Sequence, residues 1–172
     1  MPANVTLILG GAASGKSAFA ERVCVNSGKD RVYWATAQIF DTEMREKVSR
    51  HLKQRGEGWT TVEEPETAAR VLGDLAPGQI CLMDCATMWL TNHLLAGHDL
   101  AAEQDGLLAA VERCRADLVI VSNETGLGIV PENKLARRFR EAQGRLNIAL
   151  AAQADTAVQV TAGLPLVLKG TL

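Results

Sequence analysis

The feature that most constrains the fold of this chain is a glycine-rich loop, residues 10–17, with the sequence GGAASGKS. An apolar segment at residues 5–9 precedes the loop, and a segment with helical spacing at residues 18–23 follows it. The order strand, glycine loop, helix is the context in which the pattern G-x-x-x-x-G-K-[ST] forms a phosphate-binding loop, or P-loop. A ligand-free glycine turn would need neither the full spacing nor both flanks. The motif therefore predicts that the chain binds a nucleoside triphosphate.

The positions of this loop have distinct expected roles. Glycine lets backbone N–H groups approach the phosphates, and the first turn of the following helix supplies further N–H donors. We expect Lys16 to reach the β and γ phosphates as a point charge and Ser17 to place its hydroxyl on Mg²⁺. The expected phosphate-binding residues are Gly10, Gly11, Ala12, Ala13, Ser14, Gly15, Lys16 and Ser17.

Length, charge and cysteine content exclude several classes of protein. The 172 residues fit one domain that can bury a core without disulfides. A net charge of −2 gives no general basic field, so neither nucleic acid nor an anionic membrane is an expected partner. The four cysteines show no C-x-x-C pairing, which predicts reduced core residues of a cytoplasmic protein, and zinc is not an expected ligand. No targeting segment is found and no apolar run approaches about 18 residues, so we expect no membrane insertion.

Strand-like and helix-like segments alternate along the rest of the chain. Strands are expected at residues 31–36, 59–63, 79–84, 117–122, 156–161 and 164–169, and helices at residues 42–54, 65–76, 87–96, 100–114 and from 131 onward. Pro65 and Pro131 are each expected in a first helical turn, where proline is tolerated. The core face of the last helix is expected at Leu135, Phe139, Ala142, Leu146 and Leu150. This order predicts a single α/β domain over residues 1–172, of the P-loop NTPase (RecA-like) type, with a doubly wound, mostly parallel sheet and an antiparallel edge hairpin.

Two acidic residues follow apolar strands of this predicted sheet. Asp84 ends the strand at residues 79–84, where P-loop enzymes keep the acid that holds Mg²⁺ through its water shell. The alternative for Asp84 is an N-cap of the helix that follows, and the two roles do not exclude each other. Glu124 would face the same crevice, although a solvated loop acid fits its position equally well.

The three histidines differ in what their positions indicate. His51 lies three residues after Val48 and seven after Met44, beside the apolar stripe of its helix, so it faces the protein body. A neutral imidazole can act as a nucleophile toward phosphorus near pH 7, but spacing alone favours a half-buried histidine with a hydrogen-bond partner. We interpret His93 and His98, near a helix end and in a loop, as structural or solvated.

Several segments, taken in order along almost the whole chain, resemble one known family. It is the bifunctional adenosylcobinamide kinase and adenosylcobinamide-phosphate guanylyltransferase family of cobalamin synthesis. The segments that carry the resemblance are residues 10–17, 35–38, 41–44 with His51, 59–63, 84–85, 122–133 and 144–147. Two positions depart from the family pattern, since Asp84 stands where some relatives carry glutamate and Ala13 where an arginine is often found.

The resemblance implies two reactions in one domain. A nucleoside triphosphate, ATP or GTP, phosphorylates the aminopropanol hydroxyl of adenosylcobinamide. GTP then guanylylates the enzyme on a histidine, and the GMP passes to the new phosphate to give adenosylcobinamide-GDP. The resemblance also implies a corrinoid substrate, Mg²⁺ and a homotrimer.

The same resemblance implies roles for particular residues. His51 matches the guanylylated histidine, which makes it the expected nucleophile and Lys16 its catalytic partner. The further nucleotide contacts implied are Thr36, Lys53, Arg55, Glu63 and Asp84, and the metal contacts are Ser17 and Asp84. The alternatives are a small-molecule P-loop kinase without a covalent intermediate and a non-catalytic nucleotide-dependent binding module.

Overall fold

A single sheet organises the described part of the chain, residues 3–38 and 41–172 of a computed structural model; in α2 the side chains of residues 47, 51, 52 and 54 are outside the description. Within these residues seven strands form the order β3-β2-β4-β5-β1-β6-β7. The strands are β1 (Val5–Gly10), β2 (Asp30–Ala35), β3 (Trp59–Glu63), β4 (Gln79–Asp84), β5 (Asp117–Asn123), β6 (Thr156–Thr161) and β7 (Leu164–Lys169). All neighbours pair in parallel except β6 and β7, which form an antiparallel edge hairpin. The predicted fold class is confirmed.

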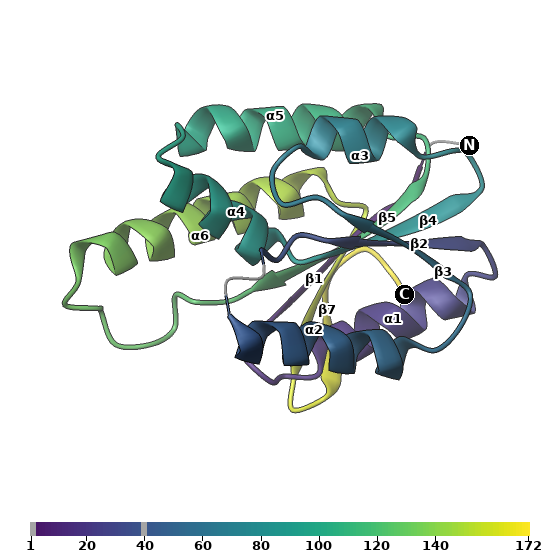
Figure 1. Cartoon of the computed structure of the whole chain (residues 1–172), viewed down its shortest axis with the longest axis horizontal. Helices are drawn as coiled ribbons and strands as arrows, with labels where there is room; N and C mark the ends of the chain where they lie inside the picture. Colours follow the sequence, from purple (N-terminus) through teal and green to yellow (C-terminus); the bar gives the residue numbers. More distant parts are fainter. Residues whose placement is uncertain (1–2, 39–40) are drawn as a thin grey trace.

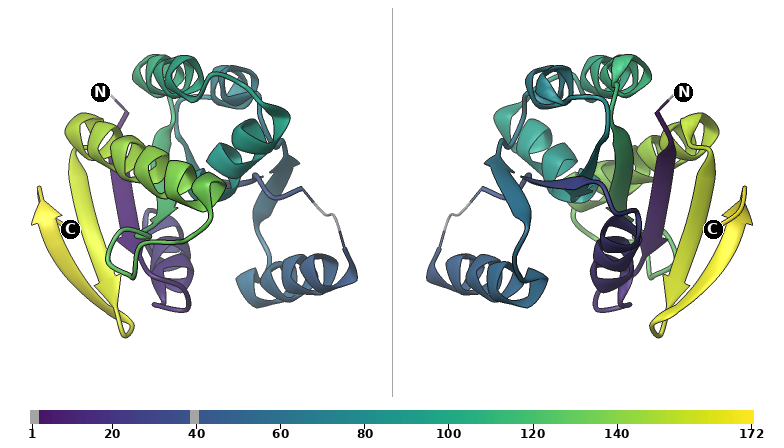
Figure 2. Two further views of the ribbon diagram at one scale, coloured as in Figure 1. Left: turned by 90° about the vertical axis from the view of Figure 1, so that its left-hand side faces the viewer. Right: turned by 90° about the vertical axis from the view of Figure 1, so that its right-hand side faces the viewer.

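Helices cover both faces of this sheet, as Figures 1 and 2 show. One face carries α1 (Lys16–Asn26) and α2 (Thr42–Arg55). The other face carries α3 (Ala68–Asp74), α4 (Ala86–Ala96), α5 (Leu100–Arg113) and α6 (Lys134–Gln153). Among the described residues, no helix combines the length and the hydropathy that a membrane span needs.

Two hydrophobic clusters fill the space between the sheet and these helices. The larger one joins Leu7 and Trp34 of the sheet to residues of α3, α4, α5 and α6, such as Leu146. The smaller one joins Ile8 to Ala20 of α1 and to neighbouring strands. Leu7 and Ile8 point to opposite faces because successive strand side chains alternate, and burial on both faces explains why the central strands β4 and β5 are continuous apolar runs.

Two helix starts differ from the sequence prediction. Pro65 and Pro131 do not open helices, since α3 begins at Ala68 and α6 at Lys134. The N-cap of α6 is Asn133, whose Oδ1 accepts hydrogen bonds from the backbone N–H groups of residues 135 and 136 at 2.7 and 3.2 Å. A side-chain acceptor of this kind stabilises a helix start by satisfying first-turn donors, which proline cannot do.

The expected core face of α6 is only partly confirmed. Leu146 and Leu150 are buried, while Phe139 and Ala142 are half-buried and pack against the larger cluster. Leu135 is 48% exposed, because it lies in the first turn of α6, which extends beyond the sheet (Figure 1).

A buried polar network fixes the position of α6 against β5. The Ser122 hydroxyl lies 2.6 Å from Oδ1 of Asn147, and the Gln143 amide donates to both of these atoms. The Asn147 amide also donates to the carbonyl of Asn123, at the last position of β5, at 3.0 Å. The end of β5 is thereby tied to the middle of α6.

Candidate nucleotide-binding site

The carboxyl ends of five parallel strands meet at one edge of the sheet. Gly10 of β1 is in register with Asn123 of β5, and Asp84 of β4 is in register with Ala35 of β2. Ala35 is in turn in register with Glu63 of β3. The P-loop and the expected acidic residues therefore lie along the same edge, where open α/β sheets bind their ligands.

The P-loop connects β1 to α1 with a backbone that only certain residues adopt easily. Ala13 has a φ of 54° and Gly15 a φ of 91°, both in the left-handed region. Lys16 is 9% exposed, and its Nζ donates a hydrogen bond to the carbonyl of Gly11 at 2.9 Å. Residues 13–18 and Glu21 border a hollow of about 430 Å³. A phosphate group in this hollow would lie against the loop and the first turn of α1.

The β6–β7 hairpin packs directly against this loop. The backbone N–H of Gly163, in the hairpin turn, donates to the carbonyl of Ser14 at 2.8 Å. A Cβ atom at Gly15 would lie 3.0 Å from Cα of Gly163, and one at Gly10 would lie 2.8 Å from the carbonyl oxygen of Val160. The packing of the hairpin therefore requires glycine at both positions.

Asp84 is oriented by a residue that the sequence analysis did not identify. The hydroxyl of Tyr33 in β2 donates to Oδ2 of Asp84 at 2.8 Å. The guanidinium of Arg55, in the last turn of α2, lies over the Tyr33 ring with 3.1 Å from its carbon to the ring centre. Burial raises the pKa of Tyr33 far above its usual value, and the adjacent Asp84 carboxylate raises it further, so the hydroxyl stays a donor.

The structure shows the local contacts of Asp84, at the end of β4, and of Thr36, which follows β2. Asp84 is not the N-cap of α4, because that position is held by Cys85, whose Sγ accepts from the Met88 N–H at 3.4 Å. Thr36 is fully buried, and its hydroxyl donates to the carbonyl of Cys85 at 2.7 Å and accepts from the Cys85 N–H at 2.8 Å. Thr36 thus holds the segment that follows Asp84.

A cavity of about 190 Å³ lies between this sheet edge and α2. From the sheet and the segment after β4 it is lined by Tyr33, Ala35, Thr61, Glu63, Asp84 and Cys85, with Ala37, Met44, Val48, Arg55 and Met88 completing the wall. Among the described side chains of α2 none is buried, and Lys53 is exposed. The described side chains of α2 therefore border a cavity and do not join the core.

The expected site residues do not all lie together in the structure. Arg55, Glu63 and Asp84 share the cavity, while Lys16 and Ser17 border the P-loop hollow. Glu124, at the end of β5, donates its backbone N–H to the carbonyl of Gly10 at 3.0 Å, and its carboxylate accepts from the N–H of Gly126. His51 lies within α2, but its side chain is outside the described part of the structure, so its role as nucleophile stays a prediction.

Comparisons with known proteins agree in pointing to one family. Residues 6–168 match the family model CobU, described as cobinamide kinase / cobinamide phosphate guanyltransferase. The bifunctional adenosylcobalamin biosynthesis protein CobP of Pseudomonas aeruginosa is 42% identical over 167 residues, which cover 95% of this chain and 96% of that protein. The corresponding protein CobU of Escherichia coli is 38% identical, covering 95% of this chain and 98% of that protein.

Solved structures with similar folds are much more distant in sequence. The flagellar accessory protein FlaH of Methanocaldococcus jannaschii aligns with a TM-score of 0.57 at 12% identity, over 99% of this chain and 80% of that chain. An ATPase of the type III secretion system of pathogenic bacteria aligns with a TM-score of 0.53 at 12% identity, over 92% of this chain and 51% of that chain. These likenesses support the P-loop NTPase fold and nothing finer.

Proposed function

The chain belongs to the cobinamide kinase / cobinamide phosphate guanyltransferase family, and from this premise we propose that it phosphorylates adenosylcobinamide and then transfers GMP from GTP to the product. As a member of that family it is a bifunctional enzyme of cobalamin biosynthesis that uses nucleotides. The observation that best supports the full proposal is the shared sheet edge, which brings the P-loop and Asp84 to the same side of the sheet as the cavity under α2.

In the kinase step, the P-loop binds the triphosphate of ATP or GTP. Lys16 exchanges its hydrogen bond to the Gly11 carbonyl for contacts to the β and γ phosphates. The aminopropanol hydroxyl of adenosylcobinamide attacks the γ phosphorus, and the nucleoside diphosphate leaves. Charge that develops on the transferred group is stabilised by Lys16 and by the N–H groups of the loop.

The residues at this edge also fit Mg²⁺. Ser17 and Asp84 offer a hydroxyl and a carboxylate oxygen, the hard donors that this ion prefers. Asp84 is held in place at the sheet edge by the Tyr33 hydroxyl, through one of its two oxygens. When bound, Mg²⁺ neutralises charge on the phosphate oxygens.

In the guanylyl step, His51 is the proposed nucleophile. Its imidazole attacks the α phosphorus of GTP and expels pyrophosphate, which leaves a phosphoramidate between the enzyme and GMP. A phosphate oxygen of adenosylcobinamide phosphate then displaces the imidazole to give adenosylcobinamide-GDP. This assignment is supported by the position of α2, which carries His51 and borders the cavity that Asp84 and Glu63 line. Thr36, Lys53 and Arg55 are proposed to help position the nucleotide.

A homotrimer is proposed as the working assembly. The loop between β5 and α6 exposes a group of large apolar side chains, which is a common property of surfaces that meet another chain. They are Leu127, Ile129 and Val130. Light scattering coupled to size-exclusion chromatography would measure the mass of the assembly, and a monomer at micromolar concentration would contradict this part of the proposal.

Incubation with GTP labelled on the α phosphate tests the covalent step. We expect one GMP per chain, located on His51 by mass spectrometry and absent from His51→Ala. Phosphorylation of adenosylcobinamide should remain measurable in that variant. The matched control is Ser49→Ala, an exposed position on the same helix, which should label normally. No label on the unmodified protein, with phosphorylation intact, would leave the small-molecule P-loop kinase as the function.

A further inference from the structure

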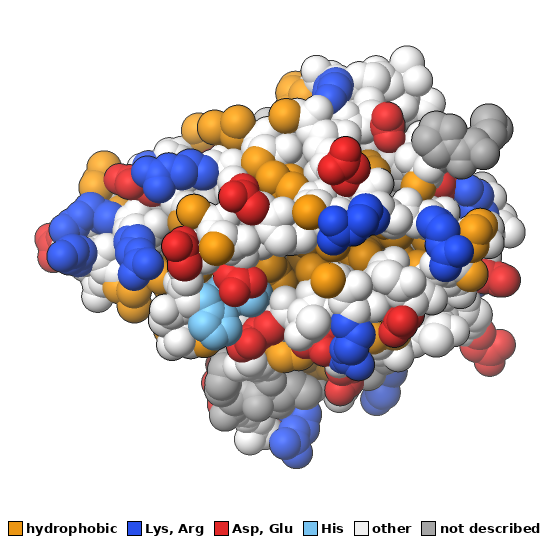
Figure 3. Space-filling view, turned by 90° about the horizontal axis from the view of Figure 1, so that it is seen from above, with side chains coloured by type: hydrophobic (Ala, Val, Ile, Leu, Met, Phe, Trp, Pro, Cys, Tyr) orange, Lys and Arg blue, Asp and Glu red, His pale blue; other side chains and the backbone are white. Residues whose placement is uncertain are grey.

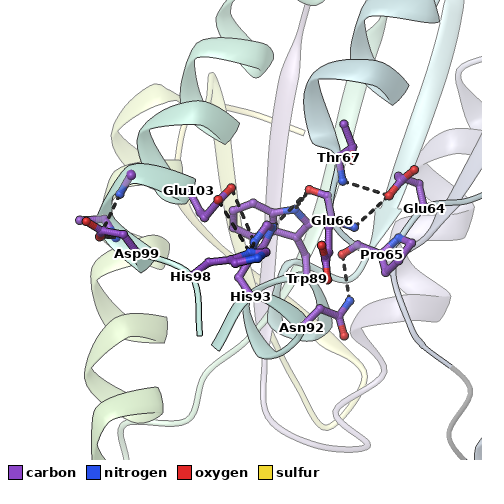
Figure 4. A network of polar contacts seen from close by, with 12 residues as sticks. Glu64, Pro65, Glu66, Thr67, Trp89, Asn92, His93, His98, Asp99 and Glu103 are labelled. Atoms are coloured by element: carbon purple, nitrogen blue, oxygen red, sulfur yellow. Dashed lines mark hydrogen bonds and ion pairs between the residues drawn. The ribbon is translucent and has the colours of Figure 1, made fainter. Parts of the chain in front are cut away.

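Three side chains that the nucleotide site does not use meet at the turn between α4 and α5. Figure 4 shows His93, His98 and Glu103 pointing toward one another. Nδ1 of His93 lies 2.8 Å from Nδ1 of His98 and 3.6 Å from Oε2 of Glu103. Nδ1 of His98 lies 3.9 Å from Oε1 of Glu103. One donor atom from each residue falls within 4.8 Å of the others.

The local backbone explains why these residues meet. Helix α4 ends at Gly97 in the left-handed conformation, with φ 77°, and the N–H of His98 returns to the carbonyl of His93 at 3.0 Å. This is the Schellman arrangement, which places the residue after the glycine over the last turn of the helix. Asp99 then caps α5 with hydrogen bonds to the N–H groups of residues 101 and 102, and Glu103 follows in the first turn of α5.

Hydrogen bonds assign the tautomer of His93. Its Nε2 faces the carbonyl oxygen of Glu66 at 3.2 Å, and a carbonyl can only accept, so Nε2 carries the proton. In the neutral ring Nδ1 is then an acceptor that faces Nδ1 of His98. The indole N–H of Trp89 donates to the same Glu66 carbonyl at 2.9 Å, and its ring packs on His93 with centroids 4.4 Å apart. The donor atom of His93 is therefore aimed before any ligand arrives.

The three side chains differ in solvent exposure, and two of them can be reached by an ion from solvent. The His93 side chain is 3% exposed, whereas the side chains of His98 and Glu103 are 39% and 37% exposed. On the surface in Figure 3, histidine side chains lie beside acidic ones. The site thus has one fixed, buried donor and two donors that solvent can reach.

We propose that His93, His98 and Glu103 bind a divalent transition metal of the zinc class. Two imidazole nitrogens and one carboxylate oxygen form a donor set that zinc uses in proteins, with water completing the fourth position. Mg²⁺ and Ca²⁺ prefer oxygen donors and do not match this set. The carbonyl of Glu66 acts on the far side of the His93 ring, as outer-shell acceptors do for metal-bound histidines. When the metal binds, the proton between the two Nδ1 atoms moves to Nε2 of His98, so that both rings ligate as neutral imidazoles.

The proposed metal would stabilise the packing of α4 against the segment that leads from the nucleotide site to α3. That segment is held through Glu66 by His93 and Trp89, and through the Pro65 carbonyl by Asn92 at 2.9 Å. Asn92 also donates to the carbonyl of Thr36 at 2.7 Å. A metal at the end of α4 should therefore raise the thermal unfolding temperature of the whole chain.

Calorimetric titration of the EDTA-treated full chain with Zn²⁺ tests the proposal, in excess Mg²⁺ and without nucleotide. We expect one equivalent of zinc with a dissociation constant below about 1 μM and a rise in unfolding temperature. His98→Ala and Glu103→Gln, both at half-exposed positions, should each weaken binding by more than about tenfold. Glu112→Gln, an exposed position on α5, is the matched control and should bind as the unmodified chain does.

Two further measurements separate this site from other metal-binding residues. His51→Ala should retain the zinc equivalent, because the third histidine is not part of the cluster. Co²⁺ in place of Zn²⁺ should give visible bands without a thiolate charge-transfer band, since no cysteine belongs to the donor set. Absence of binding, or binding that both His98→Ala and Glu103→Gln leave unchanged, would overturn the proposal.

Discussion

The Tyr33 hydroxyl donates to Oδ2 of Asp84 at 2.8 Å, which joins the last part of β2 to the carboxylate at the end of β4. The guanidinium of Arg55 in α2 lies over the centre of the same ring. One aromatic side chain thus links the cavity-lining helix to the acidic residue proposed to hold Mg²⁺. Substitutions at Tyr33 should therefore change the Mg²⁺ dependence of activity more than they change the free energy of unfolding.

Tyr33→Phe removes this hydrogen bond and keeps the ring beneath Arg55. The Asp84 carboxylate would lose its fixed orientation, so we expect the Mg²⁺ concentration for half-maximal activity to rise several-fold. The free energy of unfolding should fall by about 1 kcal/mol. Activity measured against Mg²⁺, beside urea unfolding, separates the two effects. An unchanged Mg²⁺ requirement would mean that Tyr33 serves the fold alone.

Stability should decline in alkaline solution because of buried thiols. Burial raises the pKa of Cys24 from 9.0 to about 12, and it raises the pKa of Cys81 as well. Above pH 9 the unfolded chain loses thiol protons that the folded chain keeps, so the free energy of unfolding falls as pH rises toward 12. The slope is at most about 1.4 kcal/mol per pH unit for each thiol.

Urea unfolding between pH 8 and 10.5 measures this decline, using Cys24→Ala as the comparison. The variant should lose less stability over the same interval, because one shifted thiol is gone. Below about pH 8 the thiols contribute little pH dependence, because they stay protonated in both the folded and the unfolded chain. Equal slopes for the two proteins would contradict the assignment to Cys24.

Lys16→Ala should impair both reactions, since the proposed mechanism uses the same phosphate loop twice. We expect a loss on the order of 100-fold in kcat/KM for phosphorylation and for guanylylation. The control is Lys29→Ala, which breaks an ion pair with Asp117 at the opposite edge of the sheet and should leave both activities intact. Steady-state kinetics with each substrate measure the two losses in kcat/KM. A loss confined to one reaction would mean that the two reactions use separate phosphate sites.

Gly15→Ala should weaken nucleotide binding and destabilise the fold together. The added Cβ would sit 3.0 Å from Cα of Gly163, on a residue whose φ is 91°. The left-handed backbone alone costs about 1–2 kcal/mol for a side chain. Gly73→Ala, in α3 with open space around its Cβ, should be neutral or stabilising by up to about 1 kcal/mol. Thermal unfolding and GTP titration provide the comparison.

The sequence predicts the sheet well because buried parallel strands are continuous apolar runs, such as residues 118–121. It also predicts that Asp84 lies near the P-loop, since this follows from strand ends sharing an edge. The predicted starts of α3 and α6 are wrong because a proline that a first turn tolerates does not determine where a helix begins. Helix α6 begins after the side-chain cap Asn133, and α3 begins after Thr67, which makes no cap hydrogen bond. Cap geometry depends on a few backbone angles that an apolar pattern does not specify.

Contacts between distant segments could not be predicted in this way. The role of Tyr33 depends on the register that pairs Ala35 with Asp84, and the packing of Gly15 depends on the β6–β7 turn. The sequence favours structural or solvated roles for His93 and His98, because neither position is informative alone. The spacing of five residues around Gly97, followed by Asp99 and Glu103, is the signal that could have identified the cluster.

The buried amides of Gln143 and Asn147 have a consequence for how α6 fits its partner strand. Apolar helix faces can be shifted along a sheet with a modest loss of complementarity, but displaced amides would be left without partners in a dry interior. Only one axial setting of α6 satisfies Ser122 and the Asn123 carbonyl together. The two ends of the loop before α6 are therefore anchored by one buried network, and Arg140 of α6 holds the middle of the loop by donating to the carbonyl of Ile129 at 2.9 Å.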